Sequence, residues 1–546
     1  MSGNSLLRWA LGKALRLPPR QTGKLTVEPL RIPMADGAVL LADRYYADAA
    51  PNAPVVMIRS PYGRGALFGM MAALLAERGV QVVAQSVRGT AGSEGEFAAM
   101  RQEKADGADT ISWLRGQPWF GGQLYTFGTS YLGNTQWAAA AAAPDSIDGM
   151  ALSMTLSNFK DELLGFGGFT QGGTLGWTQT MRMIISGAGM SRKQPSLDPF
   201  QDHLPVGTLD ILAFGEPVPW WQDWTQHDDP ADPWWDAINH SPAVPQIAAP
   251  TSMVAGWQDI FLPFQLKDFI ARQQAARPAW ITIGPWNHAG PGGMAESLRD
   301  AVNLYGELAK VRPNGGGIRA RRQPVRLYVQ QANQWREFPA WPPPEAQDLH
   351  LHLRSGGALD LAAGDAAEPP ARYRYDPANP TPAVHGPLVM GGDKQRDMAA
   401  LEARDDCISF SSTPLEQDAD VIGPVAVDLA VRSTLEHTDF YACLCDVDGK
   451  GVARQVCDGY VRLRPGQPEA DGDGVRRITI DLWPTAWRFR RGHALRLIVA
   501  SGAHPRYARN LGTGETLATA TRMISADQEV LLGGTRGSVL RLPMMP

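Results

Sequence analysis

The 546-residue chain is poor in cysteine, with four residues of this type, all in the C-terminal third. So few cysteines cannot form a disulfide framework for a chain of this length, and they suit a reducing compartment. They are Cys407, Cys443, Cys445 and Cys457. Cys443 and Cys445 would share one face of a strand, because side chains alternate there. We expect buried free thiols and no metal site, since no further ligands lie nearby in the sequence.

Long hydrophobic runs are also missing. No stretch of about 18 apolar residues occurs, so a membrane span is not expected. The apolar segment from Ser5 to Leu17 is interrupted by Arg8, Lys13 and Arg16, so it lacks the core of a signal peptide. We expect a short amphipathic helix that ends at the prolines in positions 18 and 19 and packs on the protein itself. A cytoplasmic location follows as the expectation.

Neither sign of charge dominates the chain. It has 51 basic and 56 acidic residues, with a formal net charge of −5, and no long stripe of Lys and Arg. A nucleic-acid partner is therefore not expected. The 44% hydrophobic and 20% charged residues are ordinary for globular proteins and sufficient for sizeable cores. At about 150 residues per domain, two to four domains are expected.

Short buried strands alternate with helices in the first part of the chain. Residues 54–60, 80–86 and 124–128 are compact apolar runs without polar alternation, which is typical of buried parallel strands. Helical stretches at 66–78 and 103–115 lie between them. This alternation predicts a parallel sheet with helices on both faces.

The pattern breaks between about residues 144 and 240, a stretch rich in Gly, Pro, Met and Trp. It returns with expected strands at 251–256 and 279–285 and an expected helix at 263–275. An insertion within an α/β domain explains this order. Six of the seventeen tryptophans lie in the insertion, and most of them are expected to form its own core: Trp177, Trp220, Trp221, Trp224, Trp234 and Trp235.

A proline-rich segment, WPPPEAQD (341–348), precedes a different pattern. Beyond it, runs with period-two alternation are separated by turns rich in Gly, Asp and Pro. Examples are DLHLHLRS, VAVDLAVRS, DFYACLCDV and HALRLIVAS. This pattern predicts a second, all-β domain of sandwich or jelly-roll type.

The strongest local motif is Gly128-Thr129-Ser130-Tyr131-Leu132-Gly133, which follows an expected strand and precedes an alanine-rich helix. A serine at a sharp strand-to-helix turn has its hydroxyl raised above the sheet, and the helix N-terminus favours developing negative charge. Small neighbours are needed because the turn is crowded. The second glycine usually comes two residues after the serine, whereas here it comes third. The motif alone is thus also compatible with a Gly-rich turn without chemistry.

A serine hydroxyl needs a base to act as a nucleophile. In α/β-hydrolases the order along the chain is serine, acid, histidine. After Ser130, Asp259 and then His288 each follow the end of an expected strand, where open α/β sheets carry their sites. The order and placement predict a Ser130–His288–Asp259 triad. The pair His350 and His352, on an expected β-domain strand, is interpreted as a surface feature and not a metal site.

A tetrahedral oxyanion also needs hydrogen-bond donors. One expected donor is the backbone N–H of Tyr131, the residue after the nucleophile. The second should come from the loop after an early strand, Arg59-Ser60-Pro61-Tyr62-Gly63. That loop offers the phenol of Tyr62, and at this point a packing role for Tyr62 stays equally open.

Several segments together resemble the cocaine-esterase-like (CocE/NonD) family of hydrolases, almost end to end from about residue 25. This family's nucleophile motif carries Ser-Tyr-x-Gly, which explains the late glycine. Many members have an aspartate where this chain has Ser86, a departure that we interpret as structural. The segments are RSPYGRG (59–65), VRGTAGSEGEF (87–97), GTSYLGNTQW (128–137), GWQDIF (256–261), GPWNH (284–288), LCDVDGKG (444–451) and DLWPTAWRFRRGHALRLIV (481–499).

The resemblance implies an α/β-hydrolase fold with an inserted helical cap and a C-terminal jelly roll. The expected boundaries are 1–144 and 241–346 for the α/β-hydrolase domain, 145–240 for the cap and 347–546 for the jelly roll. It implies Ser130, Asp259 and His288 as the triad, with the Tyr62 hydroxyl beside the Tyr131 amide in the oxyanion hole. No metal or organic cofactor is expected.

The function expected is that of a serine esterase that cleaves carboxylic esters through an acyl-enzyme. An X-Pro dipeptidyl-peptidase or an α-amino-acid ester hydrolase is the first alternative, and a non-catalytic carbohydrate-binding protein is the second. Phe261 and Trp177 are the candidate substrate-binding residues, because ligand pockets are mostly apolar and aromatic. The partner expected is a small-molecule ester. The sequence selects no oligomeric state, and a homodimer is a candidate.

Overall fold

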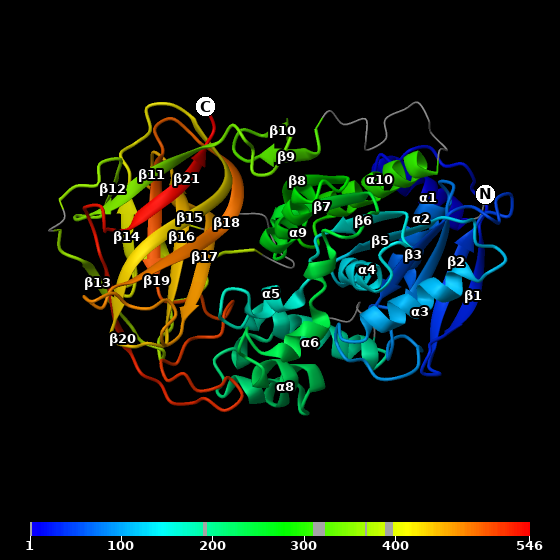
Figure 1. Cartoon of the computed structure of the whole chain (residues 1–546), viewed down its shortest axis with the longest axis horizontal. Helices are drawn as coiled ribbons and strands as arrows, with labels where there is room; N and C mark the ends of the chain where they lie inside the picture. The colour runs from blue at the N-terminus through cyan, green and yellow to red at the C-terminus, as the bar shows by residue number, and fades with distance from the viewer. Residues whose placement is uncertain (1–2, 189–193, 310–322, 366–367, 388–396) are drawn as a thin grey trace. The chain divides into compact units, whose positions relative to one another are not determined.

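The computed structural model describes residues 3–188, 194–309, 323–365, 368–387 and 397–546, and its chain divides into two units (Figure 1). The first unit comprises residues 1–160, 177–195 and 234–326, and the second comprises 161–176, 196–233 and 327–546. The chain passes into the second unit at Leu327, ahead of the proline-rich segment. The domain boundaries expected at 144, 240 and 346 stay predictions.

A twisted sheet forms the centre of the first unit (Figure 1). Its first two strands, in spatial order, run antiparallel to their neighbours, and the six that follow are parallel. The order across the sheet is β1 (Thr26–Pro33), β2 (Val39–Tyr46), β4 (Gln81–Ser86), β3 (Val55–Ser60), β5 (Leu124–Thr129), β6 (Gly149–Ser153), β7 (Thr251–Gln258) and β8 (Ala279–Asn287).

Helices cover both faces of this sheet because its parallel strands are apolar on both sides. Helices α2 (Ala66–Ala76) and α10 (Pro291–Leu308) pack with β3, β4 and β5 in one core. Helices α3 (Glu103–Arg115) and α4 (Tyr131–Ala142) pack against each other on the opposite face, where Arg59 projects. Helix α9 (Leu262–Gln274) connects β7 to β8. The predicted alternation of strands and helices is confirmed.

Strand β6 extends the sheet beyond the expected start of the insertion at residue 145. Gly149–Ser153 lies fully buried between β5 and β7 and pairs in parallel with both. Its five residues carry no turn signal that separates them from the Gly-rich sequence that follows. The sequence analysis named no strand here, although Gly149–Ser153 belongs to the sheet.

The N-terminal helix α1 (Gly3–Ala14) packs on the first unit, as the sequence predicted. Leu11, Leu15 and Leu17 contact the core formed by α2 and α10. The guanidinium of Arg8 lies 2.8 Å from Oε1 of Glu77, whose side chain is fully buried. Among the described helices, none combines the length and apolar character that crossing a membrane requires.

Short helices and turns make up most of residues 159–243. They are α5 (Phe159–Leu164), α6 (Gln171–Ile185), α7 (Leu209–Phe214), α8 (Pro219–Gln226) and the 3₁₀ turns at 198–200, 206–208, 233–238 and 241–243. Trp221 and Trp224 are almost fully buried, and the Trp221 indole donates to the Val206 carbonyl oxygen at 3.0 Å. Trp220 and Trp235 are buried as well, so most of these tryptophans fill the interior, as predicted.

The second unit is dominated by β-structure, and its long strands are confirmed where the period-two pattern predicted them. Strand β9 (Val325–Val329) spans the junction of the units, and β10 (Gln334–Phe338) follows. The described part of this unit then forms an eleven-stranded sheet of β11 (Gln347–Arg354), β12 (Ala358–Asp360), β13 (Ala371–Tyr375), β14 (Ile408–Ser411), β15 (Ala419–Ser433), β16 (Thr438–Val447), β17 (Ala453–Leu463), β18 (Arg476–Phe489), β19 (Ala494–Ala500), β20 (Ala526–Val530) and β21 (Val539–Met544).

The cysteines of the second unit are free thiols, as predicted. Cys443 and Cys445 are fully buried on one face of β16, with their sulfur atoms 3.6 Å apart. Burial raises the pKa of Cys443 and of Cys457, so both are held as unreactive neutral thiols. Cys407 is only partly buried.

Candidate active site

Ser130 sits at the turn between β5 and α4 with φ 61° and ψ −127°. A positive φ is uncommon for a residue with a side chain and is found where the surroundings enforce it. Here the Ser130 amide donates to the carbonyl oxygens of Ser153 (3.0 Å) and Met154 (3.1 Å), both at the end of neighbouring β6. The strained turn predicted from the sequence is therefore held by the adjacent strand.

The two glycines of the motif are required by close packing at this turn. A Cβ on Gly128 would lie 2.4 Å from the Cβ of Leu132, and one on Gly133 would lie 2.4 Å from a methyl of Thr155. No real Cβ approaches another carbon this closely, so larger residues would displace the backbone. The late glycine is thus explained by Thr155, which packs against the first turn of α4 and donates to the Ser130 carbonyl at 2.7 Å.

Asp259 and His288 lie past the ends of adjacent parallel strands, β7 and β8, and they are in direct contact. Nδ1 of His288 is 2.8 Å from Oδ1 of Asp259. Because a carboxylate can only accept, Nδ1 carries the hydrogen and Nε2 of the neutral ring is left as an acceptor. The Phe261 amide donates to the same Oδ1 at 3.2 Å. Asp259 is fully buried, which fixes the orientation of the imidazole.

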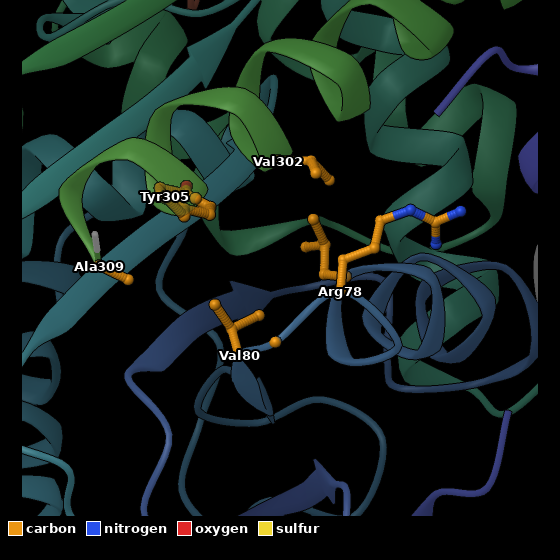
Figure 2. A pocket seen from close by; sticks show the side chains of 8 residues that line it. Arg78, Val80, Val302, Tyr305 and Ala309 are labelled. Carbon is orange, nitrogen blue, oxygen red and sulfur yellow. The ribbon is translucent and has the colours of Figure 1, made fainter. Parts of the chain in front are cut away.

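The carboxyl ends of β5, β7 and β8 share one edge of the parallel sheet, so Ser130, Asp259 and His288 all lie at that edge. A hollow lies elsewhere in the first unit, between the end of α2 and the end of α10 (Figure 2). It measures about 260 Å³ including space open to solvent, and Val80, which lines it, immediately precedes β4. This hollow therefore lies at the opposite, amino edge of the parallel strands.

Tyr62 lies just beyond β3 and connects two of the predicted site residues. Its phenol oxygen accepts a hydrogen bond from the Trp177 indole at 3.1 Å, and the Ser130 side chain lies close enough to influence the phenol. Burial raises the pKa of the Tyr62 phenol, so it stays protonated and can donate. Because the indole is donor-only, the phenol hydrogen remains available for an oxygen at Ser130.

Tyr131 occupies the first position of α4, where the backbone N–H has no partner within the helix. Its side chain is anchored on the opposite face from α2. The phenol donates to Oε1 of Glu103 at 2.9 Å and accepts from the Met100 amide at 2.9 Å. A free amide next to the nucleophile and a fixed side chain are what an oxyanion donor requires.

A series of aromatic rings runs from Trp177 to His288. Trp177 stacks on Tyr131 with ring centroids 6.2 Å apart, and Tyr131 lies 6.2 Å from Phe159. Phe159 meets Phe261 edge-on at 5.6 Å, and Phe261 meets the His288 ring edge-on at 5.0 Å. Both candidate substrate-binding residues thus belong to this series. Sequence reasoning missed Phe159, because only the turn of the chain after β6 brings it to the site.

No group of three or more His, Cys, Asp or Glu residues suited to a metal ion occurs within the described ranges. His350 and His352 both lie on β11, where they pair in register with Arg541 and Val539 of β21. Ser86 has a structural role, because its side chain takes part in holding Arg64. Its hydroxyl accepts from Arg64 at 2.6 Å, and Asp43 supplies the carboxylate for the same guanidinium at 3.3 Å.

Comparisons with known proteins identify two family models along the chain. Residues 36–290 match X-Pro dipeptidyl-peptidase (S15 family), and residues 317–541 match the X-Pro dipeptidyl-peptidase C-terminal non-catalytic domain. A curated relative, the cocaine esterase of Rhodococcus sp. (strain MB1 Bresler), is 29% identical over 94% of this chain and 97% of its own length.

Solved structures share the fold over nearly the whole chain. An aminopeptidase from a marine-sediment Thaumarchaeota archaeon has a TM-score of 0.80 at 21% identity, covering 97% of this chain and 99% of its own. An α-amino acid ester hydrolase has a TM-score of 0.80 at 22% identity with the same coverage. A CocE/NonD family hydrolase from Staphylococcus aureus has a TM-score of 0.70 at 18% identity, covering 95% and 94%. These matches confirm the predicted class, an α/β-hydrolase domain followed by a β-rich domain.

Proposed function

This chain belongs to the cocaine-esterase-like (CocE/NonD) family of α/β-hydrolases, and from that premise we propose that it is a serine esterase with Ser130 as its nucleophile. The proposal is carried by one observation. Asp259 contacts His288 at the same sheet edge at which the Tyr62 phenol lies beside the Ser130 side chain, which supports an acyl-transfer site there. The relative from Rhodococcus, named an esterase, supports ester cleavage as the reaction.

The reaction assigns a role to each of these groups. The Ser130 oxygen bonds to the carbonyl carbon while its proton moves to Nε2 of His288. Asp259 orients the imidazole and stabilises its cationic form. The Tyr62 hydroxyl and the Tyr131 amide donate to the oxyanion. The tetrahedral intermediate collapses, and His288 returns the proton to the departing alcohol. A water molecule then attacks the acyl-enzyme with His288 again as base, which releases the acid and Ser130.

We propose uncharged esters of short-chain or aromatic acids as the preferred substrates. The aromatic series contacts the candidate site at both ends, because Trp177 donates to the Tyr62 phenol and Phe261 meets the His288 ring. Burying an acyl group against such a surface gains about 25 cal/mol per Å² of apolar area. A substrate ammonium gains nothing there, because it would be desolvated without a partner.

A dipeptidyl-peptidase or α-amino-acid ester hydrolase is the main alternative, favoured by the S15 family match. Such an enzyme needs a carboxylate for the substrate's ammonium group. Three of the acidic residues in 145–240 already have partners. Asp210 accepts from the Val218 amide at 2.6 Å, Asp232 pairs with His227 at 2.6 Å, and Asp202 contacts His504 at 2.9 Å.

Covalent labelling tests the nucleophile. A fluorophosphonate should label the parent protein stoichiometrically at Ser130, and Ser130→Ala should remove both labelling and ester turnover while its melting temperature stays near that of the parent. The physical reason is that only a hydroxyl is lost. An unlabelled, inactive parent would instead favour a non-catalytic carbohydrate-binding protein, and residual turnover above a few per cent in Ser130→Ala would identify another nucleophile.

A matched substrate series tests the preference. We expect kcat/KM on nitrophenyl esters of neutral short-chain or aromatic acids to exceed that on the corresponding α-amino esters and on X-Pro nitroanilides. Each acid is compared with and without a free α-amino group, so that size and leaving group stay constant. A clear preference for the free amine would replace the esterase proposal with the aminopeptidase-like alternative.

A further inference from the structure

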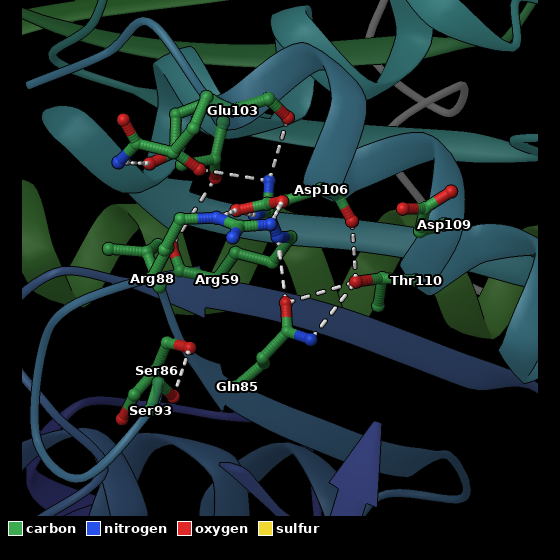
Figure 3. Close-up of polar contacts among 12 residues, drawn as sticks. Arg59, Gln85, Ser86, Arg88, Ser93, Glu103, Asp106, Asp109 and Thr110 are labelled. Carbon is green, nitrogen blue, oxygen red and sulfur yellow. Dashed lines mark hydrogen bonds and ion pairs between the residues drawn. The ribbon is translucent and has the colours of Figure 1, made fainter. Parts of the chain in front are cut away.

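A polar cluster around Arg59 and Glu103, drawn in Figure 3, lies in the first unit and contacts the Tyr131 side chain. Its centre is Arg59, on β3, whose guanidinium reaches α3 and lies 3.0 Å from Oε2 of Glu103. The Glu103 side chain is fully buried and Arg59 is 1% exposed. The Tyr131 phenol donates to the other carboxylate oxygen of Glu103 at 2.9 Å. Arg59, Glu103 and Tyr131 therefore form one continuous chain from the sheet to the start of α4.

The surrounding groups hold this chain in place. Gln85, on the neighbouring strand β4, accepts from Nε of Arg59 at 2.8 Å, and the Glu103 carbonyl accepts from Nη1 at 2.9 Å. Thr110 on α3 donates to the same Gln85 oxygen at 3.2 Å, as Figure 3 shows. Each group is fixed by at least one partner on another element. Motion of Tyr131 would therefore have to be accommodated by the whole cluster.

Stability alone gives a weak reason for such a cluster. Taking two charges out of water costs several kcal/mol per ion, and well-packed apolar side chains often serve as well or better. Two atoms of the pair make no well-aligned hydrogen bond to the described residues: Oε2 of Glu103 lies 3.0 Å from Nη1 of Arg59, and Nη2 of Arg59 lies 3.9 Å from Asp106. Burial raises the pKa of Glu103, which reflects that cost. Buried polar groups without a well-aligned partner are uncommon, so this pair calls for an explanation other than stability.

The backbone beside the cluster is strained in the same way as the nucleophile turn. Met100, whose amide donates to the Tyr131 phenol, has φ 65°, and Ser130 has φ 61°. Two side-chain-bearing residues in the left-handed region thus lie on either side of Tyr131. The Tyr131 phenol accepts a hydrogen bond from the Met100 amide, and the Tyr131 amide directly follows Ser130 in the chain. The side chain of Tyr131 is the link between the cluster and the turn.

We propose that the Arg59–Glu103 ion pair, through the Tyr131 phenol, positions the Tyr131 amide as an oxyanion donor. The inference rests on the proposed function and assigns Arg59 and Glu103 as positioning residues for the same reaction. An amide shifted by a fraction of an ångström can still donate a hydrogen bond to the oxyanion. Its misalignment should therefore lower kcat less than removal of a donor would. We expect about a 10-fold effect, below the roughly 10²–10³-fold that follows removal.

The test uses Tyr131→Phe in the full chain, with kcat expressed per fluorophosphonate-labelled site so that misfolded protein does not count. The expected result is a fall of about 10-fold in kcat per site with KM changed less than about twofold. Binding of phenylboronic acid, which forms a tetrahedral adduct with an active serine, should weaken by a similar factor. An unchanged kcat per site, even with a lower melting temperature, would show that the cluster is only structural.

A matched control is available in Tyr125→Phe. Tyr125 is also buried, precedes Ser130 on β5, and has a phenol without a hydrogen-bond partner among the described residues. It faces the core of α2 and α10, where it stacks on Tyr305 at 4.8 Å. Removing its hydroxyl should leave kcat per site unchanged. An equal fall in both variants would overturn the assignment, because it would reflect general loosening.

Glu103→Gln provides a second variant that keeps the shape of the side chain. It retains an oxygen that can accept from Tyr131 but removes the charge opposite Arg59. We expect kcat per site to fall less than in Tyr131→Phe. The affinity for phenylboronic acid should also weaken, again by a smaller factor than in Tyr131→Phe. No fall in either variant refutes the proposal. Failure of the proposed function is distinct, because the parent itself would then fail to label or turn over.

Discussion

The two units each contain a buried cluster of an arginine, a carboxylate and a tyrosine, and the clusters differ in completeness. In the second unit, Asp439 accepts from Nε of Arg462 at 2.9 Å, from its Nη2 at 2.9 Å, from Asn510 at 2.7 Å and from the Tyr460 phenol. Both oxygens of Asp439 are satisfied. In the first unit, Oε2 of Glu103 lies 3.0 Å from the Arg59 guanidinium without a well-aligned hydrogen bond, and Nη2 of Arg59 makes no hydrogen bond to the described residues.

The difference separates two uses of the same chemistry. A fully hydrogen-bonded cluster fixes the packing of the strands around it, and all its polar atoms are used in that role. The cluster at Glu103 holds the Tyr131 side chain next to the strained Ser130 turn. It thereby limits the movement of the Tyr131 amide, which has no partner within its helix. We therefore expect substitutions around Ser130 to change turnover, and equivalent substitutions around Asp439 to change only stability.

The largest effect on turnover is expected from Asp259→Asn. The asparagine would keep the shape of the side chain but remove the anion that orients the His288 ring. Its amide N–H can also donate to Nδ1, which favours the tautomer with the hydrogen on Nε2, and that tautomer cannot accept the Ser130 proton. We expect kcat to fall by about 10⁴-fold. The measurement is ester hydrolysis per milligram of folded protein, with Asp439→Asn as the same substitution in the other unit. A fall below tenfold would show that the His288–Asp259 contact is not catalytic.

Tyr62→Phe should have the next largest effect. The substitution removes only the hydroxyl that contacts Ser130 and leaves the ring stacked on Phe68, at 6.0 Å. If that hydroxyl donates to the oxyanion, kcat falls by about 10²–10³-fold with a smaller change in KM. Steady-state kinetics on a nitrophenyl ester measures both constants, with Tyr125→Phe as the control. An unchanged kcat would return Tyr62 to a packing role.

Asp439→Asn should show the smallest effect on turnover and the clearest effect on stability. It breaks the ion pair between the fully buried Asp439 and the partly buried Arg462, which holds β16 to β17, so we expect a loss of up to about 3–5 kcal/mol in the free energy of unfolding. The kcat per labelled site should stay within twofold of the parent. Denaturant unfolding and active-site labelling give the two values. A tenfold fall in kcat per site would remove the distinction between the clusters.

Much of the first unit could be predicted from the sequence because its signals are local. The helix at 103–115 was predicted with the bounds that the structure has, and the buried strands carry continuous apolar runs. Ser130, Asp259 and His288 were found because each directly follows a strand, and the chain order is informative. Strand β6 was missed because its five residues, Gly149–Ser153, are too few and too mixed in size to be distinguished from the insertion.

The support of the site was harder to predict because it depends on long-range contacts. Glu103 and Tyr131 are 28 residues apart, and Arg59 is another 44 residues before Glu103. Nothing in the local sequence distinguishes this glutamate from the other acidic residues at helix starts. Only the packing of α3 on α4 brings the three side chains together. The same holds for Phe159, whose contact with Phe261 depends on how the chain leaves β6.

The packing of α1 bears on how this protein could be trimmed or recombined with its relatives. The family resemblance begins only near residue 25, which makes the preceding segment look like a dispensable extension. Yet Glu77 is fully buried, and two of its cationic neighbours, Arg8 at 2.8 Å and Arg20 at 4.0 Å, come from that segment. A chimera that joined a relative's start to this hydrolase domain would leave this buried carboxylate with Arg78, at 4.0 Å, but without Arg8 and Arg20. Such an exchange should include residue 77 together with the helix that neutralises it.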